Sequence, residues 1–139
     1  MLAAPGRDLR LVRLSRLKDA IEASWDSRTA YLGATRPGNP ALGQCYPTAR
    51  LVQWFFPEME IVSGEVLAGA MVEHHFWNVQ PRSGTHIDFS WGQFPSGSTV
   101  RSFEVLDRTA FGDSPPTIAR CQLLLERVLA RLAAEPESA

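Results

Sequence analysis

The sequence predicts an α+β domain in which helices pack on an antiparallel sheet. Two segments with helical spacing of apolar residues come first, a block of strand-like segments follows, and a third helical segment closes the chain. Strand segments joined by short turns pair as antiparallel hairpins. A length of 139 residues with 45% hydrophobic residues suits one domain over 1–139, with a core at about 8–134 and a tail at 135–139.

The first helix is expected from about Asp8 to Trp25. Large apolar residues recur there every three or four positions, and basic residues fill the positions between them. This pattern is typical of a helix that covers a core with one face and is solvated on the other. A turn-rich loop follows at 36–40, where Pro37 and Pro40 restrict the backbone.

The second helix is expected from Tyr46 to Phe56. Pro47 is tolerated in a first turn, and Pro57 ends the helix. Cys45 therefore stands at a helix N-terminus. The expected buried side consists of Leu51, Val52, Trp54 and Phe55.

A block of strands follows this helix. Short strands are expected at Glu60–Ser63 and Ala70–Val72. A stronger pair is expected at His75–Val79 and Thr85–Phe89, because the four residues at 81–84, Pro-Arg-Ser-Gly, are typical of a turn.

The end of the chain adds one more strand and one more helix. A strand is expected at Val100–Leu106, and Pro115 opens a closing helix. Cys121 lies on the apolar side of that helix and is expected in the core. Both cysteines are expected to be free thiols.

Cys45 has the sequence position of a nucleophile. A helix N-terminus carries backbone N–H groups without partners, and their partial positive charge lowers the pKa of a thiol. The same N–H groups can stabilise the oxyanion of a tetrahedral intermediate. Taken alone, however, Cys45 is more readily interpreted as a small buried residue of the core, as free cysteines often are.

His75 and Asp88 are the residues that could complete a catalytic site. His75 could accept the thiol proton, and Asp88 could orient the imidazole. A four-residue loop at 81–84 would place Trp77 opposite Asp88. His75 would then lie opposite Ser90, on the same face as Asp88. A register shift of one residue would move Asp88 to the other face and separate the two.

Histidine, carboxylate and thiolate are also metal ligands. The spacing does not favour a metal site, because His74 and His75 point to opposite faces of a strand and no closely spaced Cys or His pair of the metal-finger type is present. We expect no metal and no other cofactor. The potential ligands are Cys45, His74, His75, His86 and Asp88.

Several motifs together resemble the YunG-like family of small bacterial proteins. Their order and spacing agree with that family over most of the chain, including its closing helix at Arg120–Val128. The motifs are Asn39–Cys45, Thr48–Ala49, His75–Asn78, Ile87–Ser90 and Gln93–Phe94.

A Cys at a helix start, a His-x-Trp-Asn strand and a following Asp strand also resemble, more distantly, the papain-like and transglutaminase-like cysteine enzymes. This resemblance implies a papain-like α+β fold with Cys45, His75 and Asp88 in the positions of a catalytic triad.

The same resemblance implies a side-chain amide ahead of the cysteine that assists the oxyanion hole. Asn39 and Gln44 are the candidates, although Gln44 is directly beside Cys45, which is not the usual spacing. Trp77 is a candidate for substrate contact, but aromatic residues in strands more often belong to the core.

The expected function is thiol-dependent acyl transfer. Cys45 would attack an amide, ester or thioester carbonyl, and either water or an amine would resolve the acyl-enzyme, so a hydrolase and a transferase both fit. The expected partner is a small-molecule or peptide acyl substrate. The alternative is a catalytically silent papain-like fold that binds a peptide or a partner protein through the same groove.

Composition argues against two other classes of partner. The formal net charge of −1 provides no basic field for nucleic acid. No apolar stretch is long enough for a signal peptide or a membrane span, so we expect no membrane association and a cytoplasmic location.

Overall fold

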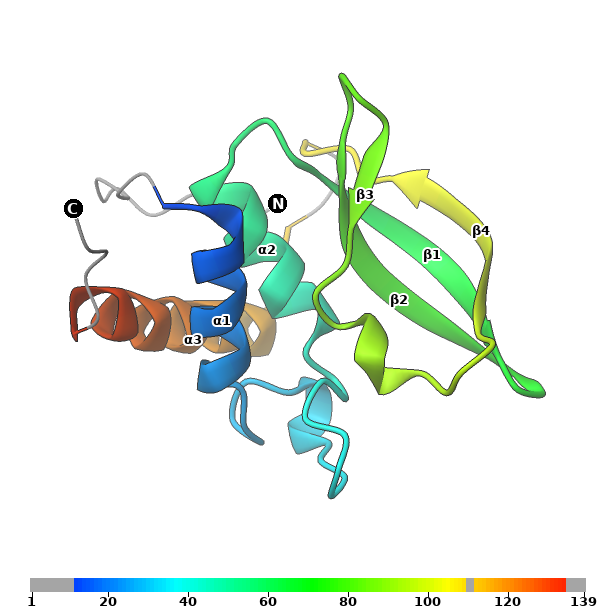
Figure 1. Cartoon of the computed structure of the whole chain (residues 1–139), viewed down its shortest axis with the longest axis horizontal. Coiled ribbons are helices and arrows are strands. Elements are labelled where there is room, and N and C mark those ends of the chain that lie inside the picture. Colours follow the sequence, from blue (N-terminus) through cyan, green and yellow to red (C-terminus); the bar gives the residue numbers. More distant parts are fainter. Residues whose placement is uncertain (1–11, 110–111, 135–139) are drawn as a thin grey trace.

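The computed structural model describes residues 12–109 and 112–134. The helices gather on one side of the molecule and a sheet forms the other (Figure 1), so the predicted α+β class is confirmed. The elements are α1 (Leu14–Ser24), the 3-10 turn η1 (Tyr31–Gly33), α2 (Cys45–Phe55), β1 (Glu60–Ala68), β2 (Met71–Gln80), β3 (Thr85–Ile87), the 3-10 turn η2 (Trp91–Gln93), β4 (Thr99–Val105) and α3 (Pro115–Ala134).

The central element is α2, which lies between the sheet and the other helices. It contacts β2 and β1 on one side and α3 on another, and α3 in turn packs on α1. Residues 47–54 of α2 are therefore all buried, unlike those of a surface helix with one apolar face. The core between the helices includes Leu17, Ile21, Leu51, Val52, Leu124 and Val128, and the predicted core residue Cys121.

The sheet is antiparallel, with strand order β3-β2-β1-β4. β1 and β2 form a long hairpin that turns at Gly69, whose φ of 63° suits glycine. The strands predicted at Glu60–Ser63 and Ala70–Val72 are parts of longer ones, because β1 continues to Ala68 and β2 runs without a break from Met71 through the predicted strand at His75–Val79. Residues 71–74 are exposed, so their sequence shows no alternation of buried apolar and exposed polar residues. Backbone pairing with β1 stabilises this part of the strand.

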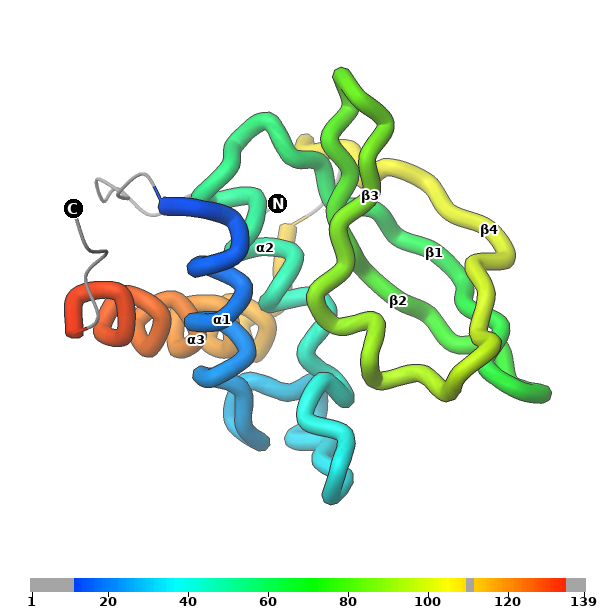
Figure 2. The backbone as a smooth tube through the Cα atoms, in the orientation of Figure 1, coloured from blue at the N-terminus to red at the C-terminus, as the bar shows by residue number. Residues whose placement is uncertain are grey.

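The hairpin of β2 and β3 has the predicted register. Gln80 pairs with Thr85, and Asn78 pairs with Ile87 across the four-residue loop. β3 ends at Ile87, two residues earlier than predicted, so Asp88 leaves the strand just beyond its last pair. The backbone then turns through η2 and returns as β4 on the far edge of the sheet (Figure 2).

The first helix is shorter than predicted. Val12 and Arg13 are not helical, and Arg13 has the extended backbone of an N-cap, so α1 begins at Leu14. The expected segment 8–11 and the expected tail 135–139 lie outside the described residues. No helix within the described ranges is long and apolar enough to cross a bilayer.

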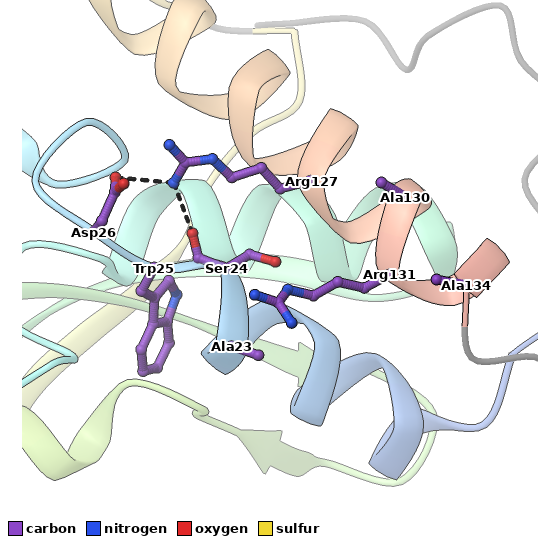
Figure 3. A pocket seen from close by; sticks show the side chains of 8 residues that line it. All are labelled: Ala23, Ser24, Trp25, Asp26, Arg127, Ala130, Arg131 and Ala134. Atoms are coloured by element: carbon purple, nitrogen blue, oxygen red, sulfur yellow. Dashed lines mark hydrogen bonds and ion pairs between the residues drawn. The ribbon is translucent and has the colours of Figure 1, made fainter.

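The loop after α1 is fastened to α3. Arg127 Nη1 donates to the backbone oxygen of Ser24 and pairs with Asp26 Oδ1, both at 2.9 Å (Figure 3). This contact lowers the pKa of Asp26 through its hydrogen bond to Arg127. The loop that carries Asp26 is also the one that anchors the start of α2.

Candidate active site

Gln44 fixes the start of α2 immediately before Cys45. Its side chain is 1% exposed, its Oε1 accepts from Thr29 Oγ1 at 2.7 Å, and its Nε2 donates to the backbone oxygen of Asp26 at 2.9 Å. Both ends of the amide are therefore engaged away from the cysteine. This placement corrects the interpretation of Gln44 as an oxyanion-hole amide, because the side chain anchors the helix instead.

Cys45 is the first residue of α2 and is half-buried. Neither its backbone N–H nor that of Tyr46 donates a backbone hydrogen bond among the described residues. Pro47, in the third helical position, has no N–H to contribute. Within the described ranges, these two N–H groups at the start of α2 therefore have no backbone acceptor.

His75 is fully buried in β2, within an aromatic enclosure formed by Trp77, Trp91 and Phe94. Its Nε2 lies 2.7 Å from Asp88 Oδ2. A carboxylate only accepts hydrogen bonds, so Nε2 carries a hydrogen.

Asp88 is itself held in place by its neighbours. Its Oδ1 accepts from the backbone N–H of Ser90 at 3.1 Å and from the Ser90 hydroxyl at 3.3 Å. Ser90 therefore holds Asp88 in place, and Asp88 in turn fixes the orientation of the His75 ring.

The imidazole of His75 has a raised pKa. Burial opposes the positive charge, but hydrogen bonds to Asp88 and to Cys45, together with the attraction of those two acidic groups, outweigh that effect and raise the pKa to about 9. The raised pKa favours the protonated form of the ring.

Gln93, in η2, is a site residue that the sequence interpretation missed. Its Nε2 lies 3.4 Å from His75 Nδ1 and donates to the backbone oxygen of Ser90 at 3.1 Å. An amide nitrogen has two hydrogens. One is donated to the Ser90 oxygen, so the other remains available in the space beside His75 Nδ1. In the sequence, the only sign of such a role was that Gln93 belongs to one of the motifs that resemble the YunG-like family.

Asn39 supports Gln93 and is not itself beside the thiol. Its Nδ2 donates to the backbone oxygen of Gln93 at 3.0 Å, which ties the loop before α2 to the turn after β3. Among the described residues, Asn39 does not line the cavity that contains Cys45. The Asn39 amide therefore helps to hold the backbone of Gln93 in place.

Cys45 opens onto a cavity of about 610 Å³, which is within the size range of small-molecule sites. Gln93 also lines this cavity, whereas His75 lies behind its wall. Since Nε2 of His75 is bound to Asp88 and Nδ1 faces Gln93, the cavity side of the ring is Nδ1. The apolar lining comes from Tyr31, Ala34, Leu42, Tyr46, Pro47 and Phe76.

Trp77 lies elsewhere. It is 4% exposed, its Nε1 donates to His86 Nδ1 at 2.8 Å, and it lines a separate cavity of about 420 Å³ together with Asp88. Its ring packs over Gly64, where a Cβ would lie 2.4 Å from Trp77 Cη2. The interpretation of Trp77 as a contact in the Cys45 cavity is therefore corrected to a core role.

The remaining histidines do not join Cys45 in a metal centre. His74 Nε2 lies 2.6 Å from Ser63 Oγ, and His86 is bonded to Trp77. Within the described ranges, no three His, Cys, Asp or Glu side chains are close enough to hold a metal ion.

A family model described as "YunG protein" matches residues 13–133. No curated protein matches the chain significantly. No solved structure does so either. The match covers α1 through nearly all of α3 and includes each residue of the site described above. The chain therefore belongs to the YunG protein family.

Proposed function

We propose that this protein is a thiol-dependent acyl-transfer enzyme in which Cys45 is the nucleophile. The observation that carries the proposal is the buried His75, bonded to Asp88 at 2.7 Å and with its Nδ1 beside Gln93, which lines the same cavity as Cys45. An imidazolium beside a thiol at a helix N-terminus favours the thiolate, which is the reactive form.

In the first step, the Cys45 sulfur attacks the carbonyl carbon and a C–S bond forms. The carbonyl oxygen takes up the negative charge. We assign its stabilisation to the backbone N–H of Cys45 and to Gln93 Nε2, because Gln93 lines the same cavity as Cys45.

His75 then donates its Nδ1 proton to the leaving amine, alcohol or thiol as the bond from that group to the carbonyl carbon breaks. The product is a thioester on Cys45 and a neutral imidazole. Water or an amine next attacks the thioester, Nδ1 accepts its proton, and the Cys45 thiolate leaves. Asp88 keeps the hydrogen on Nε2 throughout, so that Nδ1 is always the nitrogen that exchanges the proton.

A relationship to papain-like and transglutaminase-like enzymes forms part of this proposal. It is supported by the chain order of a cysteine at a helix start, a histidine in a strand and an aspartate just after the next strand. The bond between His75 and Asp88 gives that order the geometry of an orienting pair.

The test is the rate at which iodoacetamide modifies Cys45 as a function of pH, read by peptide mass spectrometry. Cys121 is an internal reference, because burial raises the pKa of its thiol to about 12. We expect Cys45 to react at pH 6 at least about tenfold faster than N-acetylcysteine amide, since a simple thiol has a pKa of about 8.5 and is almost wholly protonated there.

The opposite outcome is a Cys45 rate that follows the model thiol across the whole pH range. The enzyme proposal would then fail, and the cavity would be left as a peptide- or protein-binding groove. Replacement of Cys45 by Ala should abolish the fast reaction without slowing any modification of Cys121.

A further inference from the structure

An acidic and a basic side chain, Asp113 and Arg120, also line the cavity that contains Cys45. Asp113 is almost fully buried, and its charge is balanced by Arg50, whose Nη2 lies 3.2 Å from Asp113 Oδ2. The Tyr46 hydroxyl also bonds to Asp113 and to Arg50. At this end of the cavity the charges of Asp113 and Arg50 therefore face each other.

Arg120, on the first turns of α3, differs from Asp113. No carboxylate among the described residues lies within salt-bridge distance of its guanidinium. Its Nη2 donates to Thr117 Oγ1 at 3.0 Å, and its Nε is buried without a hydrogen-bond partner. A buried donor of a charged group that lacks a partner is costly, and such groups are characteristic of ligand contacts.

The guanidinium is also held in a defined place. Its Cζ lies 5.5 Å from the centroid of the Tyr31 ring, in a cation–π contact, and Tyr31 lines the same cavity. The lining of the cavity also includes the apolar side chains of Leu42 and Phe76 and the ring of Tyr46. The cavity thus combines a thiol, apolar side chains and a guanidinium that no carboxylate of the described residues pairs with.

From this arrangement we infer that the cavity selects acyl substrates that carry a carboxylate, and that Arg120 binds this carboxylate while Cys45 attacks the carbonyl. The inference rests on the proposed function and names the substrate class of the same site. A guanidinium binds a carboxylate through two parallel hydrogen bonds, so it fixes the direction of the substrate as well as its charge. The apolar side chains would contact the carbon chain between the two groups.

Pairs of thiol reagents that differ only in charge test this inference. Iodoacetylglycine is compared with iodoacetylglycinamide, and 4-(iodoacetamido)butanoic acid with its primary amide, so that two spacings are sampled. The measured quantity is the ratio of the rate of Cys45 modification by each acid to that by its amide. For the better spacing, we expect an acid-to-amide ratio of about ten in the native protein, as a charge-assisted hydrogen bond implies.

The ratio should fall to one or below in Arg120→Gln, because the variant has no cation to bind the carboxylate. Arg101→Gln is the matched control, because it removes the same charge from an exposed position on β4, where the side chain is 62% exposed. This control should keep the native ratio. An equal ratio in the native protein and in Arg120→Gln would overturn the inference.

Two features keep the experiment decisive. Should Arg120→Gln fail to fold, Tyr31→Leu removes the ring on which the guanidinium rests, at a residue that is 61% exposed, and it should lower the ratio. The neutral amide reports the reactivity of the thiol by itself. If the neutral amides modify Cys45 slowly but the acid-to-amide ratio stays high, the proposed function fails and the carboxylate site stands. If the neutral amides react fast but the ratio is about one, the carboxylate site fails and the proposed function stands.

Discussion

Asp88→Asn removes the carboxylate that accepts from His75 Nε2 at 2.7 Å and keeps the volume of the side chain. In the native protein, burial opposes the charge on His75, while Asp88 and Cys45 raise the pKa to about 9. In the variant, the opposing burial stays and the main favourable group is gone. We expect the pKa of His75 to fall to its ordinary value of 6.5 or lower.

The size of the effect follows from these values. At pH 7.5 a histidine with a pKa of about 9 is almost wholly protonated, whereas one with a pKa of 6.5 is about one-tenth protonated. The imidazolium that favours the Cys45 thiolate would therefore be lost from most molecules. The expected result is a fall of about tenfold in the rate of Cys45 modification by iodoacetamide at that pH.

The same change alters the pH dependence of stability. Folded His75 has a higher pKa than unfolded His75, so between pH 6.5 and about 9 the folded state binds more protons. Its contribution to the free energy of unfolding is complete below pH 6.5 and lost by about pH 9. At about 1.4 kcal/mol per pKa unit this is at most about 3 kcal/mol.

Two assays measure these effects. Titration of the His75 ring by NMR gives the pKa directly, and urea unfolding at pH 6 and pH 9 gives the stability change. The native protein should lose stability over this interval, and Asp88→Asn should lose much less. A His75 pKa near 6.5 in the native protein, or one that Asp88→Asn does not change, would refute the reasoning.

Three further substitutions test separate contacts. Gln93→Ala should slow acyl transfer from an activated ester by about 10²-fold, as the loss of one oxyanion donor does. It should not slow alkylation by iodoacetamide, because that reaction forms no oxyanion. The control Gln122→Ala, at an exposed position on α3, should slow neither reaction. Gln44→Ala should lower the free energy of unfolding by about 2 kcal/mol in urea titrations, because it removes two hydrogen bonds made by a side chain that is 1% exposed. A loss no larger than that of Gln122→Ala would contradict the anchoring role. Gly64→Ala should destabilise the sheet by about 1–3 kcal/mol or more, since the new Cβ would lie 2.4 Å from Trp77 Cη2 and 2.7 Å from Ser102 O, and an unchanged melting temperature would be the contrary result.

The sequence was sufficient for those features of the site that depend on local geometry. Pro47 and Pro57 bracket α2, which places Cys45 at its start. The four-residue loop at 81–84 determines the register, and the register places His75 and Asp88 on one face. Each of these predictions needed only a turn length or a helix boundary.

Features that depend on contacts between distant segments were not predictable. Gln93 reaches His75 because Asn39, 54 residues earlier, holds its backbone oxygen. Arg50 is fully buried in a helix expected to bury only apolar residues, because Asp113 arrives from the segment before α3 to pair with it. Neither pairing leaves a periodic or local pattern in the sequence.

The extent of β2 was missed for a different physical reason. Its outer half is exposed, so no apolar alternation distinguishes Met71 to His74 from a loop. Backbone pairing with β1 holds this part of the hairpin together, and such pairing depends little on side-chain identity.

The central claim is that Cys45 forms a covalent acyl intermediate with the help of His75. The most direct measurement is rapid mixing with a panel of activated esters, followed by acid quenching and peptide mass spectrometry. We predict an acyl group on Cys45 in the native protein, formed at least about a hundredfold more slowly in a folded His75→Gln variant, as the loss of general acid–base catalysis implies. An acyl group that appears on Cys45 at the same rate in both proteins, or on no cysteine in either, would contradict the claim.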